Sequence, residues 1–475
     1  MTLPNDWEMV IGLEVHTELK TTTKMFCGCA NVFGSEPNTN ICPVCLGLPG
    51  SLPVLNVHAV DLAMAIGIAL HSTIASSTFH RKNYFYPDMP KDFQISQYDL
   101  PINSGGHLDL PDGSRVSVER AHLEEDTGKS THLGGSGRIQ GADRSLVDYN
   151  RSGVPLVEIV SGPDIRSSAQ ARAYASELRG ILIATGASDG RMEEGSMRMD
   201  ANVSVRKPGA PLGTRCEIKN LNSLRSLQRA IDFEALRQVE LIEGGGTVRQ
   251  ETRHWDEQLG ETSTMRTKEE AEDYRYFREP DLVDLVPDQA WQDRIRASLG
   301  QMPAERRAVL LARLDDPTSS QLDALEVVVD LGFDALVISA IDAKVDASIA
   351  LARAANELAA GIDNIANLTP EAFIATLKME QGGELSATQA KTVLLEILQH
   401  GGDPRTVASA KGFEQLSSDS LGATVGELIT QFPEEWSRYR DGDEKLAQFF
   451  IGQVMKLTSG KANGKSVIAE LQARR

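Results

Sequence analysis

Residues 9–19 read MVIGLEVHTEL, and apolar and polar side chains alternate strictly along this stretch. An alternation with a period of two is typical of a β-strand that buries one of its faces. The other face of this strand carries Glu14, His16 and Glu18 in a row. The stretch therefore predicts a half-buried strand with two carboxylates and an imidazole on its polar face.

Similar patterns elsewhere in the chain predict more strands at 115–124, 154–160, 197–206 and 215–219. Helical periodicity appears at 56–75, 167–186 and from 224 to about 243, and after Met302-Pro303 only helical patterns remain. The predicted fold class is α+β, with a mixed, mainly antiparallel sheet and helices followed by all-helical segments. The predicted domains are 1–295, 296–405 and 406–475.

Composition limits the classes of function. The chain has 475 residues and a net charge of −19, which argues against a general polyanion binder. The N-terminus lacks the apolar core of a signal peptide, and no window has the apolar length of a membrane span. These features predict a cytoplasmic protein that is not bound to a membrane.

Residues 121–132 read AHLEEDTGKSTH and place three carboxylates side by side. Adjacent carboxylates repel one another, so such a run is either a solvated turn or is held by a cation. In a regular strand Glu124 and Asp126 share one face and Glu125 lies on the other. For all three acids to serve one site, the chain must turn at Glu125.

Acids on the predicted strands suggest a metal site. Glu158 is the lone acid of an apolar strand, so it must be paired or ligated. Oxygen-rich groups suit Mg²⁺ or Mn²⁺, and the number of acids allows two metal positions. Separate surface acids and an inert Ca²⁺-type site remain as alternatives. The candidate ligands are Glu14, His16, Glu124, Glu125, Glu158, Asp200 and Glu217.

Two close cysteine pairs predict a second kind of metal site. Cys27 and Cys29 are followed by Cys42 and Cys45, a spacing that suits tetrahedral thiolate ligation of structural Zn²⁺. The alternative is a set of thiols that no longer binds metal. Cys216, on the apolar side of its strand, is predicted to be a core residue.

Residues 80–103 are aromatic, basic and interrupted by proline. This composition predicts a loop rich in groups that recognise ligands, with a packed Tyr/Phe loop as the alternative.

Eight segments together resemble the GatB family, whose members are components of the bacterial tRNA-dependent amidotransferases. The first contains the motif GLEVH at 12–16, and the segments follow the family order along nearly the whole chain. They are residues 8–35, 81–99, 122–131, 145–164, 193–205, 219–223, 273–282 and 450–456.

The resemblance implies a fold made of a cradle domain, a helical domain and a small YqeY-like tail that contacts tRNA. It implies a carbon–nitrogen ligase that amidates Glu on tRNA(Gln), Asp on tRNA(Asn) or both. ATP would phosphorylate the side-chain carboxylate, and ammonia released from glutamine by a GatA subunit would displace phosphate. The partners would be GatA, GatC and the misacylated tRNA.

The resemblance also implies roles for individual residues. His16, Glu124, Glu125 and Glu158 would hold one Mg²⁺ or Mn²⁺, and a second position would lie among Glu14, Asp200 and Glu217. Glu125 and Lys82 match residues that line the entry of ammonia, and the four clustered cysteines match zinc ligands of some members. The rival hypothesis is a zinc-bearing RNA-binding scaffold without catalysis.

Overall fold

The computed structural model describes residues 3–4, 6–134, 141–267, 274–413, 418–458, 462 and 464–475. The chain divides into two compact units, Met1–Ala304 and Glu305–Arg475. Each unit is described by itself. The finer division into three domains stays a prediction.

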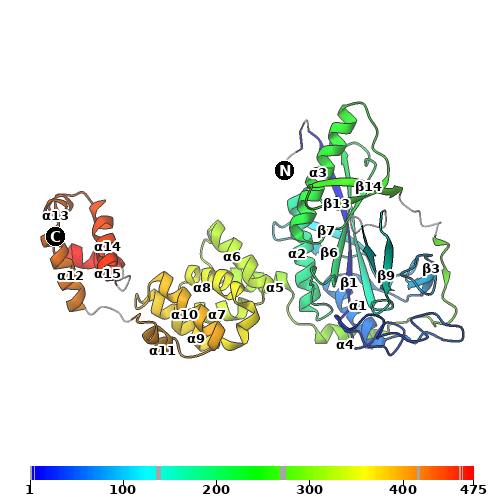
Figure 1. The fold of residues 1–475 in the computed structure, drawn as a ribbon, viewed down its shortest axis with the longest axis horizontal. Coiled ribbons are helices and arrows are strands. Elements are labelled where there is room, and N and C mark those ends of the chain that lie inside the picture. The colour runs from blue at the N-terminus through cyan, green and yellow to red at the C-terminus, as the bar shows by residue number, and fades with distance from the viewer. Residues whose placement is uncertain are drawn as a thin grey trace. The chain divides into compact units, whose positions relative to one another are not determined.

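The first unit is built on a sheet whose middle contains β1 (Glu8–Glu18), the strand predicted from residues 9–19 (Figure 1). Neighbouring strands are antiparallel except for β12 and β13, so the sheet is mixed and mainly antiparallel, as predicted. The strand order is β14 (Glu261–Thr267), β13 (Glu251–Asp256), β12 (Cys216–Lys219), β11 (Met197–Arg206), β1, β10 (Pro155–Ser161), β7 (Arg115–Glu125), β4 (Phe93–Ser96), β3 (His80–Asn83) and β15 (Phe277–Arg278).

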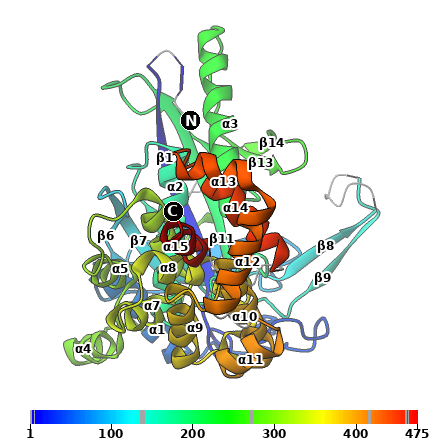
Figure 2. The same cartoon turned by 90° about the vertical axis from the view of Figure 1, so that its left-hand side faces the viewer.

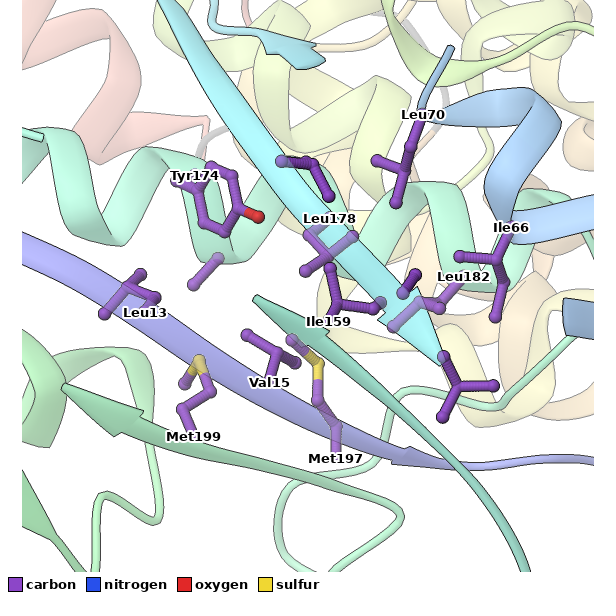
Figure 3. Packing of buried hydrophobic residues seen from close by; sticks show 14 of the residues in the cluster. Leu13, Val15, Ile66, Leu70, Ile159, Tyr174, Leu178, Leu182, Met197 and Met199 are labelled. Atoms are coloured by element: carbon purple, nitrogen blue, oxygen red, sulfur yellow. The ribbon is translucent and has the colours of Figure 1, made fainter. Parts of the chain in front are cut away.

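Helices bury the apolar face of this sheet. They are α1 (Val57–Ala69), α2 (Ser168–Ala184) and α3 (Leu224–Glu243), and α4 (Gln289–Ser298) packs beside α1. Polar side chains cap the helices at their first turns, with Ser167 accepting from the Gln170 amide and Ser223 from the Ser226 amide. Leu13 of β1 lies in the same apolar cluster as Leu178 of α2 (Figure 3). The opposite face of the sheet keeps the ionisable groups.

Smaller strands complete the first unit. β2 (Thr73–Ile74), β5 (Asn103–Ser104) and β6 (His107–Asp109) attach to β7 or to each other, and β8 (Lys129–Leu133) with β9 (Arg144–Asp148) forms a separate hairpin. Figure 2 shows this hairpin projecting from the sheet. The prediction of a loop over 80–103 is wrong, because β3, β4 and β5 lie there. Backbone pairing with β7 overrides a local composition that favours a loop.

The second unit is helical and contains two hydrophobic cores, one within residues 310–408 and one within 421–471. The predicted capping box of Ser386 with Gln389 and the N-cap of Asp403 before Pro404 are confirmed. In the described residues no helix has the length and apolarity needed to span a bilayer. The helices are α5 (Pro303–Leu311), α6 (Ser319–Asp330), α7 (Asp334–Asp342), α8 (Ala347–Arg353), α9 (Pro370–Gln381), α10 (Ala387–His400), α11 (Pro404–Ala410), α12 (Ser418–Gln431), α13 (Pro433–Arg440), α14 (Leu446–Leu457) and α15 (Gly464–Ala473), with a π-turn, η2 (Ala354–Leu358), and a 3₁₀ turn, η3 (Ile362–Asn367).

Candidate metal and catalytic site

The register of the strands gathers the acids of the polar face around β1. His16 lies opposite Glu158 of β10, and Glu14 lies opposite Asp200 of β11. Residues directly opposite in an antiparallel pair have neighbouring side chains. The result is two groups, each with its potential ligand atoms within 4.8 Å of one another: a first cluster of His16, Glu124 and Glu158, and a second cluster of Glu14, Asp200 and Glu217.

The first cluster combines two carboxylates with one imidazole. The Nε2 atom of His16 lies 3.9 Å from Oε1 of Glu124 and 3.7 Å from Oε2 of Glu158. Glu124 is buried, whereas His16 and Glu158 are partly exposed, so the group opens toward solvent on one side. These donors fit Mg²⁺ or Mn²⁺, since hard oxygen ligands dominate and one imidazole is tolerated.

His122, which sequence reasoning did not assign to the site, supports the first cluster from within β7. Its Nε2 atom lies 3.4 Å from Oε2 of Glu158, and burial lowers the pKa of the ring to about 4. A neutral ring can donate a hydrogen bond to Glu158 and orient that carboxylate, as residues behind a metal ligand often do. The strand alternation that pairs His122 with Glu124 was the available indication.

Lys82 of β3 also faces the first cluster, so the structure brings this predicted catalytic residue to the predicted ligands. Burial by itself lowers the pKa of the ammonium group, but the carboxylates of Glu124 and Glu158 outweigh burial and raise it. Lys82 therefore stays protonated and places a fixed positive charge beside the two acids.

The second cluster already contains a cation from the protein. The Nζ atom of Lys219 forms an ion pair with Asp200 and lies 3.2 Å from Oε1 of Glu217. The amide of Asn202 donates to Oε1 of Glu14 at 2.9 Å. Burial lowers the pKa of Lys219, but Asp200 and Glu217 raise it by more, so the ammonium is charged. A divalent ion at the second cluster must compete with this ammonium.

Lys219→Met is expected to raise the affinity of the second cluster for Mn²⁺ by about tenfold or more, which corresponds to about 1.4 kcal/mol of ion-pair energy. Methionine keeps the length of the side chain and removes its charge. Titration followed by electron paramagnetic resonance would measure the affinity. Lys129→Met, at an exposed lysine of β8, is the control. Equal affinities in wild type and Lys219→Met would show that Lys219 does not compete with the metal.

Glu125 points away from both clusters. Strand β7 continues through this residue without the turn that a joint site requires, so its carboxylate faces the other side of the sheet. There it pairs with Lys91 and accepts a hydrogen bond from the Ile95 amide at 2.9 Å. Both side chains line a cavity of about 230 Å³, together with Arg81 and Glu279. The structure thus separates Glu125 from the other predicted metal ligands.

Asp126, the third acid of the run, anchors a buried charge network. It accepts a hydrogen bond from Nη2 of Arg198 at 2.6 Å, and Nε of Arg151 lies 3.5 Å away. Burial, reinforced by the neighbouring Asp126 carboxylate, raises the pKa of Glu18 to about 8. One proton is therefore shared by the Glu18 and Asp126 pair near neutral pH, and Asp126 is explained by charge pairing.

The four predicted zinc ligands come together as a third group. The sulfur atoms of Cys27, Cys29, Cys42 and Cys45 lie within 4.8 Å of one another, and the amide of Cys42 donates to Sγ of Cys45 at 3.1 Å. A hydrogen bond from the Cys27 thiol is the largest of the effects that lower the pKa of Cys45 to about 5. Four sulfurs in this arrangement fit a structural Zn²⁺. Cys216 lies apart and is buried, as predicted for a core residue.

Purified protein is expected to contain roughly one zinc per chain, and Cys42→Ser is expected to lose most of it. The same change should lower the melting temperature by several degrees, because metal binding stabilises the folded loop. Cys216→Ser is the matched control and should retain the metal. Elemental analysis of the three proteins tests this, and wild-type protein without zinc would contradict the prediction.

Comparisons with known proteins agree with this geometry. Residues 9–293 match the family profile of the GatB/GatE catalytic domain, and residues 333–474 match the profile of the GatB domain, of YqeY type. The chain belongs to the GatB family. The resemblance inferred from sequence motifs is thus confirmed, and so is the α+β fold with a YqeY-type C-terminus.

Relatives of this GatB-family chain match it over nearly its whole length. The B-type component of the aspartyl/glutamyl-tRNA(Asn/Gln) amidotransferase of Frankia casuarinae is 48% identical over 97% of this chain and 94% of its own length. The proteins of the same name from Moorella thermoacetica and Streptomyces avermitilis are 47% and 45% identical, over 96% and 97% of this chain. They are covered over 97% and 94% of their own lengths.

Proposed function

We propose that this GatB-family chain is the subunit that activates and amidates aminoacyl-tRNA in a glutamine-dependent amidotransferase, a carbon–nitrogen ligase. Its substrates are Glu on tRNA(Gln), Asp on tRNA(Asn), or both, as in the names of its relatives. The observation that carries the proposal is the pair of clusters side by side on one open sheet face. Glu14 and His16, two residues apart on β1, belong to different clusters.

The reaction needs an activated carboxylate. A side-chain carboxylate oxygen attacks the γ-phosphorus of ATP, the bond to the β-phosphate oxygen breaks, and ADP leaves. Ammonia then attacks the acyl carbon, the bond from that carbon to the phosphate oxygen breaks, and phosphate leaves. The new nitrogen loses a proton to give the amide. Each step brings anions together, so the site must supply positive charge.

The residues of the two clusters would hold Mg²⁺ or Mn²⁺. Bound there, the ions neutralise and orient the phosphates of ATP. Lys82 adds an ammonium group next to Glu124 and Glu158, where it can attract the substrate carboxylate before transfer and stabilise phosphoryl oxygens during it. His122 orients Glu158. In the proposal Lys82 is catalytic because it is the fixed cation closest to the first cluster.

Glu125 has a different role in the proposal. With Lys91 it lines the cavity on the other side of β7, which suits a polar path for ammonia better than metal ligation. Ammonia would come from glutamine in a GatA amidase subunit, with GatC completing the heterotrimer. Cys27 and Cys45 border the same cavity, so a structural Zn²⁺ would stabilise its wall. Because the product serves translation, the proposed location is the cytoplasm.

Reconstitution of the complex with its partner subunits tests the proposal. Each misacylated tRNA is supplied with either glutamine or ammonium chloride, with and without ATP and Mg²⁺. Amide is expected with both nitrogen donors and only when ATP and metal are present. The rival scaffold, suggested by the cysteine group, would bind tRNA without any turnover of ATP. Binding without amide in every arm would therefore reject the proposed activity.

A further inference from the structure

Three tyrosines next to the first cluster have no part in the proposed chemistry. Tyr98 follows β4 and Tyr276 precedes β15, and their rings stack at 4.1 Å with an angle of 8° between the planes. The ring of Tyr274 meets Tyr276 at 6.0 Å and 70°. These three residues are called the tyrosine row.

Several contacts place the tyrosine row at the edge of the first cluster. The Nζ atom of Lys82, which faces Glu124, lies 4.8 Å from the ring centre of Tyr274. Oγ of Ser96 lies 3.4 Å from Oε2 of Glu124, and Tyr98 follows Ser96 by two residues. Burial raises the pKa of Tyr276, and the carboxylates of the first cluster raise it further. The row and the cluster therefore share one surface.

The tyrosine row is open to ligands at one end. Tyr98 is 46% exposed although its ring is stacked on Tyr276, so packing into a core does not account for it. Aromatic rings and cations continue nearby. The guanidinium of Arg275 lies 5.7 Å from the ring centre of Phe85, which is 63% exposed. More than one base-sized surface is thus available, with a cation beside it.

Aromatic rings in succession with cations between them form the usual surface for single-stranded nucleic acid. We infer that the tyrosine row stacks the unpaired 3′-terminal nucleotides of the aminoacyl-tRNA and so holds the aminoacyl group over the first cluster. The identity of the ligand rests on the proposed function. The adenine of ATP would need only one ring, whereas the row and its surroundings offer several.

Binding by the reconstituted complex tests this inference without turnover. Tyr98→Ala and Tyr276→Ala are expected to raise the Kd for intact tRNA by about tenfold, the value of one lost stacking contact. Tyr98→Phe keeps the ring and should restore most of the affinity. A tRNA trimmed of its single-stranded 3′ end should bind wild type and both alanine variants equally. Phe33→Ala, at an exposed aromatic residue outside the row, is the control.

Two outcomes would overturn the inference. One is an equal loss of affinity for intact and trimmed tRNA, or no loss for either. The other is a rise in the KM for ATP with unchanged tRNA binding, which would assign the row to the adenine of the nucleotide. Melting temperatures close to wild type show that the variants are folded. A wild-type complex that makes no amide would count against the proposed function, while the binding comparison would still decide the role of the row.

Discussion

Glu158→Gln is expected to lower the rate of ATP-dependent amidation by about 1,000-fold or more, which corresponds to about 4 kcal/mol of transition-state stabilisation. The substitution keeps the shape of the side chain and removes a charge that faces both His16 and His122. Loss of a metal ligand should weaken Mn²⁺ binding at the first cluster and slow the formation of ADP and amide together. The measurements are the single-turnover rates of both products and the Mn²⁺ affinity.

Glu8→Gln is the matched control for this experiment. Glu8 lies on the same strand as His16 but outside both clusters, and its carboxylate pairs with Arg206. Its loss should leave Mn²⁺ affinity and rates near those of wild type. Normal amidation by Glu158→Gln, with normal metal affinity, would remove the first cluster from the reaction.

Glu125→Gln is the second change with a large expected effect. Glu125 and the side chain of Lys91 are almost completely buried, so the substitution leaves a buried ammonium without its counter-charge. Breaking such a pair destabilises a protein by about 3–5 kcal/mol. We expect a loss of that size in the free energy of unfolding, a loss of amidation with glutamine, and unchanged Mn²⁺ binding, because Glu125 faces away from both clusters. Glutaminase activity of the reconstituted complex should survive.

The double variant Glu125→Gln/Lys91→Met separates stability from chemistry. Removing both charges should recover much of the stability, since no unpaired charge stays buried. If amidation stays low while stability recovers, the polar pair itself is needed for ammonia to reach the site. If amidation recovers with stability, the role of Glu125 is structural. Loss of Mn²⁺ binding in the single variant would instead return Glu125 to the metal ligands.

The strands that carry the site were predictable because alternation is a local property. The patterns at 9–19, 115–124, 154–160 and 197–206 correspond to β1, β7, β10 and β11. Alternation also indicates that Glu124 and Glu125 lie on opposite faces of one strand. The pairing of the four cysteines in space follows from their close spacing in the chain.

Contacts across the sheet could not be predicted in the same way. Lys91 and Lys219 stand in no pattern that identifies a partner, yet each is ion-paired with a candidate site residue. The region from 80 to 103 has the composition of a loop and forms strands because β7 offers it backbone partners. His122 gained its place behind Glu158 only through the register of β7 with β10.

The order of residues was enough to establish the α+β class, the half-buried strands, the faces on which their acids lie and membership of the GatB family. Those properties depend on periodicity and motif order, which are carried by neighbours in the chain. The folded structure was needed to show that the acids divide into two clusters, that Lys219 occupies the second, and that Glu125 belongs to a cavity on the other side. Strand order and register create these relations, and hydrogen bonds between distant segments set both.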